Sequence, residues 1–249
     1  MTRQIHSPGL SGSTLKLIAI VTMLIDHLGA TVLRTLCRLP SIKAVPGGQA
    51  FFISVYQSSR SIGRIAFPIF CFLLVEGFLH TRNAGKYAFR LFLFALISEL
   101  PFDIALKGAW FYPQKQNVYF TLLIGLLVLI GFRFADSHFS GKGLHILIRL
   151  LLSVLILGLG MRLSYLLQTD YNFKGVFLIA LLYQLRQSRI LQSLCGACCV
   201  AWELPAPIAF LPITLYNGKR GLQMKYFFYW FYPVHLLILH LINTIISLH

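Results

Sequence analysis

Long apolar runs fill the chain almost from end to end, and short polar segments separate them. A helix that crosses a membrane needs about 20 mostly apolar residues, within a range of about 17 to 25. The pattern therefore predicts membrane helices over residues 14–36, 63–81, 86–107, 117–134, 143–163, 173–187, 189–203 and 225–247. Ser13 or Thr14 is expected to cap the first of them, because hydroxyl side chains accept hydrogen bonds from free helical N–H groups.

Two stretches leave the helix count open at eight or nine. Residues 40–62 carry Pro, Gly and Ser, so we expect a loop there, with a re-entrant turn around the apolar patch Phe51–Val55. Residues 208–216 follow Pro205 and Pro207 and are short, which indicates half of a discontinuous helix. Irregular backbone at membrane depth is tolerated only inside protein or beside water.

The composition fits lipid as the main solvent of the fold. Hydrophobic residues make up 57% of the 249 residues, charged residues 12%, and the mean hydropathy is +0.74. A soluble domain has about 25% charged residues. The fold class expected is therefore all-α, a polytopic integral membrane helix bundle, with residues 1–249 forming a single transmembrane domain. The first apolar run is too long for a signal peptide, so we expect it to be retained as a helix.

The net charge is +15, and the positions of the basic residues along the chain are more informative than this total. Basic residues lie singly or in pairs between apolar runs, where they meet anionic headgroups, so no nucleic-acid partner is expected. With a cytoplasmic N-terminus, twelve lie on the inner side: Arg3, Lys16, Arg82, Lys86, Arg90, Arg133, Lys142, Arg186, Arg189, Lys219, Arg220 and Lys225. Nine lie on the outer side: Arg34, Arg38, Lys43, Arg60, Arg64, Lys107, Lys115, Arg162 and Lys174. This excess favours the N-terminus inside.

The cysteines do not form a metal site in this interpretation. Cys195, Cys198 and Cys199 have a spacing found in metal and redox sites, but no second Cys/His pair with zinc spacing follows. Free cysteine behaves as a small hydrophobic residue, so we expect packing roles and no metal.

Ionisable residues inside apolar runs need a partner or a function, since a charge at mid-membrane costs at least about 2.5–3.5 kcal/mol. Asp26 and His27 lie about twelve residues into the first helix, or about 18 Å along its axis. His235 lies near the middle of the last helix. Histidine titrates near neutral pH, so both suit proton transfer. Adjacent helical residues point about 100° apart, so a carboxylate or Asn from another helix is expected to orient His27.

A second polar set surrounds the third and fourth predicted helices. Glu99 and Asp103 flank Pro101, and Asn117 shares a helix face with Thr121. Near the predicted inner ends lie Arg90 and the Gly-flanked pair Lys219–Arg220. Such a turn can bind phosphate through charge and backbone N–H groups, or it can simply anchor the chain at the headgroups.

Seven segments in series resemble the TraX family of membrane proteins, over nearly the whole chain. They are Ile18–Gly29, Gly63–Gly77, Ala95–Asp103, Asn117–Gly125, Asp170–Gly175, Tyr216–Gly221 and Lys225–His235. One position departs from the family pattern: Asn172 follows Tyr171 where many relatives have Gly.

The resemblance implies an acyltransferase of the bacterial inner membrane that takes acetyl groups from acetyl-CoA on the cytoplasmic side. Founding members acetylate the N-terminus of pilin; the acceptor here is expected to be an amine or hydroxyl of an envelope molecule, such as pilin, a glycan or a lipid. Carried onto this chain, the resemblance gives His27 as the base, with Asp26, Asn117 and His235 as further catalytic residues. Arg64, Arg90, Lys219 and Arg220 are expected at the acetyl-CoA and Glu99, Asp103 and Asp170 at the acceptor. The alternatives are a proton-coupled transporter or flippase, and a non-catalytic scaffold.

Overall fold

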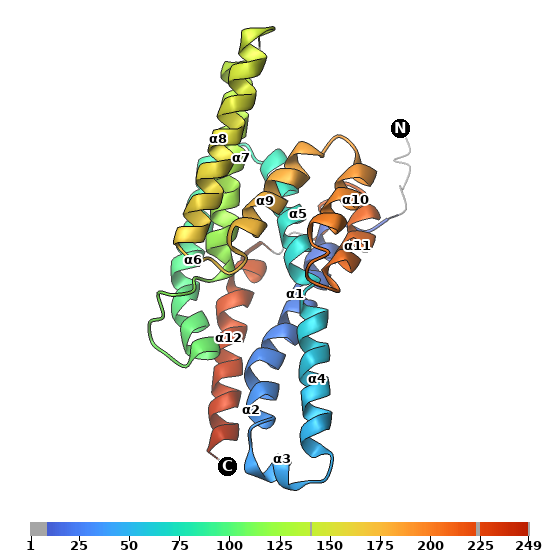
Figure 1. Cartoon of the computed structure of the whole chain (residues 1–249), viewed down its shortest axis with the longest axis vertical. Coiled ribbons are helices and arrows are strands. Elements are labelled where there is room, and N and C mark those ends of the chain that lie inside the picture. The colour runs from blue at the N-terminus through green and yellow to red at the C-terminus, as the bar shows by residue number, and fades with distance from the viewer. Residues whose placement is uncertain (1–8, 140, 223–224, 249) are drawn as a thin grey trace.

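The computed structural model describes residues 9–139, 141–222 and 225–248, and Figure 1 shows how their helices are arranged. The elements in chain order are α1 (Gly12–Leu28), the π-helix η1 (Gly29–Leu33), α2 (Arg34–Leu36), α3 (Pro40–Ala44), α4 (Gly48–Gly63), α5 (Ala66–Leu79), α6 (Ala84–Lys107), α7 (Val118–His138), α8 (Leu144–Leu166), α9 (Asn172–Gln184), α10 (Arg189–Cys199), the 3₁₀-helix η2 (Ala206–Ala209), α11 (Phe210–Thr214) and α12 (Lys225–Ser247). The described residues contain no β-strand, so the all-α prediction is confirmed.

Within the described residues, five segments are long and apolar enough to cross a membrane: residues 12–36, 48–79, 118–138, 144–166 and 226–247. Helix α8 is the most apolar of these, and its buried residues are only Gly160 and Ser164, so its Leu-rich surface faces lipid. Helix α6 has the length but carries Arg90, Glu99 and Asp103. The thirteen residues of α9 span about 20 Å, which is less than the roughly 30 Å of a hydrocarbon core. The protein is thus a polytopic membrane helix bundle in which short helices are shielded by long ones.

The prediction of a loop over residues 40–62 is wrong. Helix α4 fills most of this stretch and continues almost directly into α5. Small residues serve close packing here: Ser59, within that stretch, faces Gly29 of η1, and Gly63, at the end of α4, faces Asp26 of α1. A Cβ at position 63 would lie 2.2 Å from the Cβ of Asp26, so only glycine allows α1 to approach this closely. The N-cap of α1 is Ser11, not Ser13 or Thr14; its hydroxyl accepts a hydrogen bond from the Thr14 N–H.

The core lies where α5, α7 and α9 pack together. Its largest fully buried side chains there are Ile69, Phe72, Phe78, Leu126, Leu129, Leu178, Ile179 and Leu182. Helix α1 packs against α4, α5 and α12, and α6 packs against α7 and α12. In Figure 1, α1, α4 and α12 run side by side in the lower half, and α9, α10 and α11 lie together above them. This arrangement brings the first and last helices, which carry the two predicted histidines, into contact.

Candidate functional site

The two mid-helix histidines form a direct pair. His27 Nδ1 and His235 Nε2 are 2.7 Å apart, and the rings are nearly parallel, with an interplanar angle of 12°. Only 8% of His27 and 4% of His235 is exposed. The expectation that a carboxylate or Asn orients His27 is therefore wrong: its hydrogen-bond partner is the imidazole of α12.

The backbone of α1 is irregular directly after His27. The Thr31 hydroxyl donates to the His27 carbonyl oxygen at 2.6 Å, within the π-helix η1. Single π-helical turns inside longer helices occur frequently at functional sites. The ring of Tyr232 meets both histidines edge-on, at 5.8 and 5.7 Å between centroids. An aromatic side chain therefore borders the histidine pair.

Asp26 faces away from the pair, toward α4. Its Oδ2 accepts a hydrogen bond from Arg60 Nη1 at 2.6 Å, so Asp26 faces a different neighbour from His27, in line with the angle of about 100° between adjacent helical residues. The sequence interpretation did not select Arg60, because it lay in the stretch predicted to be a loop. The only sequence feature that could have pointed to Arg60 was its position as a basic residue beside a segment of apolar and small residues.

Two further ion pairs lie near Asp26 and Arg60. Arg64 Nη1 is 2.9 Å from Glu203 Oε1, and Lys115 Nζ is 2.9 Å from Asp170 Oδ1. Asp26 interacts electrostatically with Arg64 and Asp170 as well, and Glu203 interacts with Asp170 and Arg60. We call the three pairs Asp26–Arg60, Arg64–Glu203 and Lys115–Asp170 the ion-pair cluster. Burial raises the pKa of the Glu203 carboxyl above its ordinary value of 4.5, and Arg64 opposes that rise.

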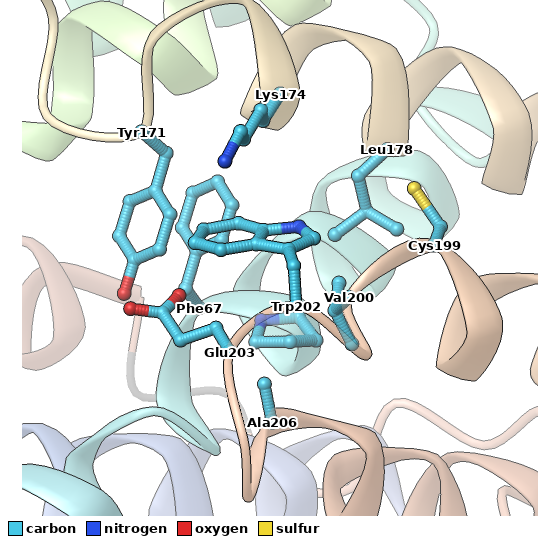
Figure 2. A pocket seen from close by; sticks show the side chains of 11 residues that line it. Phe67, Tyr171, Lys174, Leu178, Cys199, Val200, Trp202, Glu203 and Ala206 are labelled. Carbon is cyan, nitrogen blue, oxygen red and sulfur yellow. The ribbon is translucent and has the colours of Figure 1, made fainter.

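A narrow pocket adjoins this cluster, with Phe67, Tyr171, Lys174 and Trp202 in its lining (Figure 2). The Trp202 indole lies across it, with the Lys174 amino group 3.6 Å from the ring centroid, a cation–π distance. The rings of Phe67 and Tyr171 are stacked. The free volume is only about 10 Å³, which corresponds to about one water molecule.

Asn117 and the carboxylates of α6 form a separate polar group. Asn117 caps α7: its side-chain oxygen accepts from the Tyr119 N–H at 2.9 Å. Its amide nitrogen donates to Glu99 Oε2 and to the Ala95 carbonyl oxygen. Asp103 Oδ2 accepts from the Tyr112 N–H at 2.7 Å. Because both donors of the Asn117 side chain are used within the fold, they are not available to a substrate oxygen.

A large cavity of about 760 Å³ opens between the ends of α1, α5, α6, α7 and α12. Four cations line it: Lys16, Arg82, Arg90 and Arg220. Its apolar lining includes Phe70, Leu73, Leu74, Leu91 and Leu122. Among the described residues, Glu76 is the one carboxylate in the lining, and it is already paired with Arg189 at 3.3 Å. We call this space the basic cavity.

The predicted phosphate-binding residues do not all reach the basic cavity. Arg90 and Arg220 line it, whereas Lys219 is exposed and is absent from the lining, and Arg64 belongs to the ion-pair cluster. Arg90 shares a hydrogen bond with Tyr229, but its buried Nε has no partner among the described residues. Lys16 and Arg82 were counted in the sequence only as orientation signals.

One aromatic layer lies between the basic cavity and the histidine pair. Tyr119 lines the cavity, and its ring is edge-on to Tyr232 at 5.2 Å. Tyr232 in turn borders His27 and His235. The Tyr119 hydroxyl donates to the Tyr229 carbonyl oxygen at 3.4 Å. Pro233 lacks the N–H that would otherwise bond this carbonyl, so Tyr119 replaces it.

Comparison with known proteins identifies the family of the chain. A family model described as TraX protein matches residues 11–243. The chain belongs to the TraX family. It is also similar to the "Probable fimbrial assembly protein FimC, serogroup H1" of Dichelobacter nodosus, at 29% identity over 92% of this chain and 94% of that protein. No solved structure matches.

Asn172, where many TraX relatives have Gly, keeps a glycine-like backbone in this TraX-family protein. Asn172 has a φ of 50° at the start of α9. Asparagine is among the residues that tolerate positive φ, and its side-chain oxygen accepts from the Phe173 N–H at 2.7 Å. The turn after Tyr171 therefore forms without glycine, and Asp170 remains beside Lys115.

Proposed function

We propose that this TraX-family protein is a membrane-embedded acyltransferase that moves an acetyl group from acetyl-CoA to an amine or hydroxyl of an envelope molecule. The observation that carries the proposal is the position of the basic cavity, one aromatic layer away from a buried histidine pair. The phosphates of acetyl-CoA would be bound by Lys16, Arg82, Arg90 and Arg220, and its pantetheine arm would follow the apolar wall toward Tyr119.

In the proposed acyl transfer, the histidine pair supplies the general base. The acceptor nitrogen or oxygen attacks the thioester carbonyl carbon while His27 takes its proton. The C–S bond then breaks, and the CoA thiolate recovers that proton from His27. General-base assistance of this kind contributes about 10²–10⁴-fold. Asn117 has no role in the transfer step, since its donors are already bonded.

The acceptor is proposed to approach from the side of the ion-pair cluster, away from the basic cavity. A pilin or fimbrial subunit is supported by the similarity to a probable fimbrial assembly protein and by the activity of founding family members. A cell-surface glycan or lipid satisfies the same chemistry. Of the three residues expected at the acceptor, Asp170 lies in the ion-pair cluster, whereas Glu99 and Asp103 lie in the polar group around Asn117.

The direct test uses purified protein, radiolabelled acetyl-CoA and an envelope extract from a strain lacking the protein. We expect covalent label transfer, or slow hydrolysis of acetyl-CoA without an acceptor. His27→Ala should lower turnover by about 10²–10⁴-fold, whereas His240→Ala on α12 should not. A His27→Ala variant with more than about a tenth of wild-type turnover would contradict the proposed base. Vesicles that accumulate unmodified substrate, with no covalent label, would favour the transporter alternative.

Orientation is part of the proposal, because acetyl-CoA is cytoplasmic. Three segments meet at one end of the bundle: the start of α1, residues 215–222 and the connection between α5 and α6. The Gly12 N–H donates to the Lys219 carbonyl oxygen, and Arg220 Nη2 donates to the His80 carbonyl oxygen. We propose that this end is cytoplasmic. Cysteine introduced at position 219 should react with an impermeant reagent only from inside; labelling from outside would place the basic cavity on the wrong side.

A further inference from the structure

The hydrogen bonds of the histidine pair determine which nitrogen atoms carry hydrogen. His235 Nδ1 is 2.7 Å from the Phe231 carbonyl oxygen, one turn earlier in α12. A carbonyl oxygen only accepts, so His235 Nδ1 must be the protonated nitrogen of that ring. In a neutral imidazole the other nitrogen then has a free lone pair. His235 Nε2, 2.7 Å from His27, is therefore an acceptor.

The same reasoning continues to His27. Since His235 Nε2 accepts, His27 Nδ1 must donate, and His27 Nε2 is left with the lone pair. Each ring thus has a single tautomer as long as the pair is neutral. The chain of donors runs from His27 to His235 and ends at the Phe231 carbonyl oxygen.

We propose that His235 is a positioning residue that holds His27 in the Nδ1–H tautomer, so that His27 Nε2 is the atom that takes the proton of the acceptor. This inference rests on the proposed acyl transfer for its functional part only. When Nε2 takes the proton, the hydrogen bond from His27 Nδ1 to His235 becomes charge-assisted and therefore stronger. His235 thus stabilises the imidazolium that forms during the transfer.

A neutral orienting group suits this buried position. A carboxylate at the place of His235 would add a negative charge to a buried site, which costs free energy unless a cation is paired with it. An imidazole acceptor fixes the ring equally well and leaves His27 neutral before the reaction. Asp26, the neighbouring carboxylate, is turned toward Arg60 and makes no hydrogen bond with His27 that would compete.

The tautomer can be measured without any activity assay. Protein carrying ¹⁵N-labelled histidine is studied by NMR in detergent or lipid, and the His27 signals are assigned by their loss in His27→Gln. We expect His27 with hydrogen on Nδ1 and a bare Nε2 in the wild type, and a mixture of tautomers in His235→Ala. A wild-type His27 with hydrogen on Nε2 would overturn the inference even if the protein transfers acetyl groups.

The functional part is tested with three variants of α12: His235→Ala, His235→Gln and His240→Ala. The Gln carbonyl oxygen can accept from His27 Nδ1 as the imidazole does, so it should preserve the tautomer. We expect kcat to fall about 10–100-fold in His235→Ala with little change in the KM for acetyl-CoA, as for other residues that orient a reactive group. His235→Gln should recover most of this loss and His240→Ala should match the wild type.

The outcomes separate this inference from the proposed function. Wild-type turnover in His235→Ala, together with loss of turnover in His27→Ala, overturns the role of His235 and leaves acyl transfer intact. If the wild type transfers no acetyl group, the proposed function fails, and the NMR measurement still decides the tautomer. If His235→Ala does not fold, His235→Gln decides: loss as complete as in His27→Ala contradicts a purely positioning role.

Discussion

At one end of the bundle four cations line a cavity in which the described residues supply one carboxylate, whereas near Asp26 three cations each face a carboxylate of their own. Both regions are rich in charge inside a chain with few charged residues. In the ion-pair cluster the charges satisfy one another within the fold. In the basic cavity they do not, because Glu76 is occupied by Arg189. Net positive charge around a large space indicates an anionic ligand, whereas paired charge indicates a structural role.

The largest effect should come from removing two cations of the basic cavity. Arg90→Ala combined with Arg220→Ala should weaken acetyl-CoA binding about 100-fold or more, because hydrogen bonds to charged groups contribute about 1.5–3 kcal/mol each. Thermal stability should change little. Equilibrium binding to the detergent-purified variant measures the affinity.

Lys219 provides a matched control for Arg220, its neighbour in sequence. Lys219 is exposed and does not line the cavity, so Lys219→Ala should bind acetyl-CoA like the wild type. Equal losses in Lys219→Ala and Arg220→Ala would show that the Gly218–Gly221 turn, and not the cavity wall, binds the phosphates.

The ion-pair cluster should respond in the opposite way. Arg64→Ala leaves Glu203 mostly buried without its guanidinium, which should lower the free energy of unfolding by about 1–3 kcal/mol. Acetyl-CoA affinity should be unchanged. Thermal unfolding in detergent measures the loss, and adding Glu203→Gln should restore most of it. A double variant as unstable as Arg64→Ala would mean that the unpaired charge of Glu203 is not the source of the loss.

A smaller effect is expected from pH, and its sources are the two carboxylates that interact with Arg64, Glu203 and Asp26. The pKa of Glu203 in the folded protein lies above its ordinary value of 4.5, so near these pH values the native state binds more protons than the unfolded state. The free energy of unfolding therefore falls as the pH rises from 4.5 through the pKa of the folded state. Without Arg64 the pKa should rise further. The stability gap between wild type and Arg64→Ala should therefore grow from pH 4.5 toward pH 8. Asp170, Arg60 and Lys174 also interact with Glu203, but they are present in both proteins. A gap that does not change with pH would exclude Glu203 as its source.

The smallest expected effect is that of salt. Raising the ionic strength from about 0.1 M to 1 M shortens the Debye length from about 10 to 3 Å. Acetyl-CoA affinity should fall several-fold, because salt screens the charges of the basic cavity where water reaches them. The difference in unfolding free energy between the wild type and Arg64→Ala should stay nearly constant. Salt that weakens both equally would mean that the two regions are equally open to solvent.

The sequence predicted most of the helices, but not which side chains meet. Apolar runs of spanning length are visible in one dimension, so α7, α8 and α12 appear within a few residues of the predicted ranges. The contact between His27 and His235 depends on the rotation of two helices far apart in the chain. A single sequence contains no measure of that rotation.

The failures at residues 40–62 and at Lys16 have a common cause. Glycine and serine promote turns in water, but between membrane helices they allow close packing, and local composition is the same in both cases. Similarly, a lysine near a helix end meets headgroups in most membrane proteins, and only the packed bundle shows that Lys16 lines a cavity with Arg90 and Arg220. Both distinctions depend on what lies opposite, which is a tertiary property.

The contact between Gly63 and Asp26 has a genetic consequence. Every missense change of codon 63 adds a Cβ, and that atom would lie 2.2 Å from the Cβ of the residue that precedes His27. Helix α1 would have to move, and His27 would move with it. In a saturation mutagenesis library selected for function, position 63 should therefore tolerate no amino acid other than glycine, as if it were part of the active site, although glycine there has no reactive group.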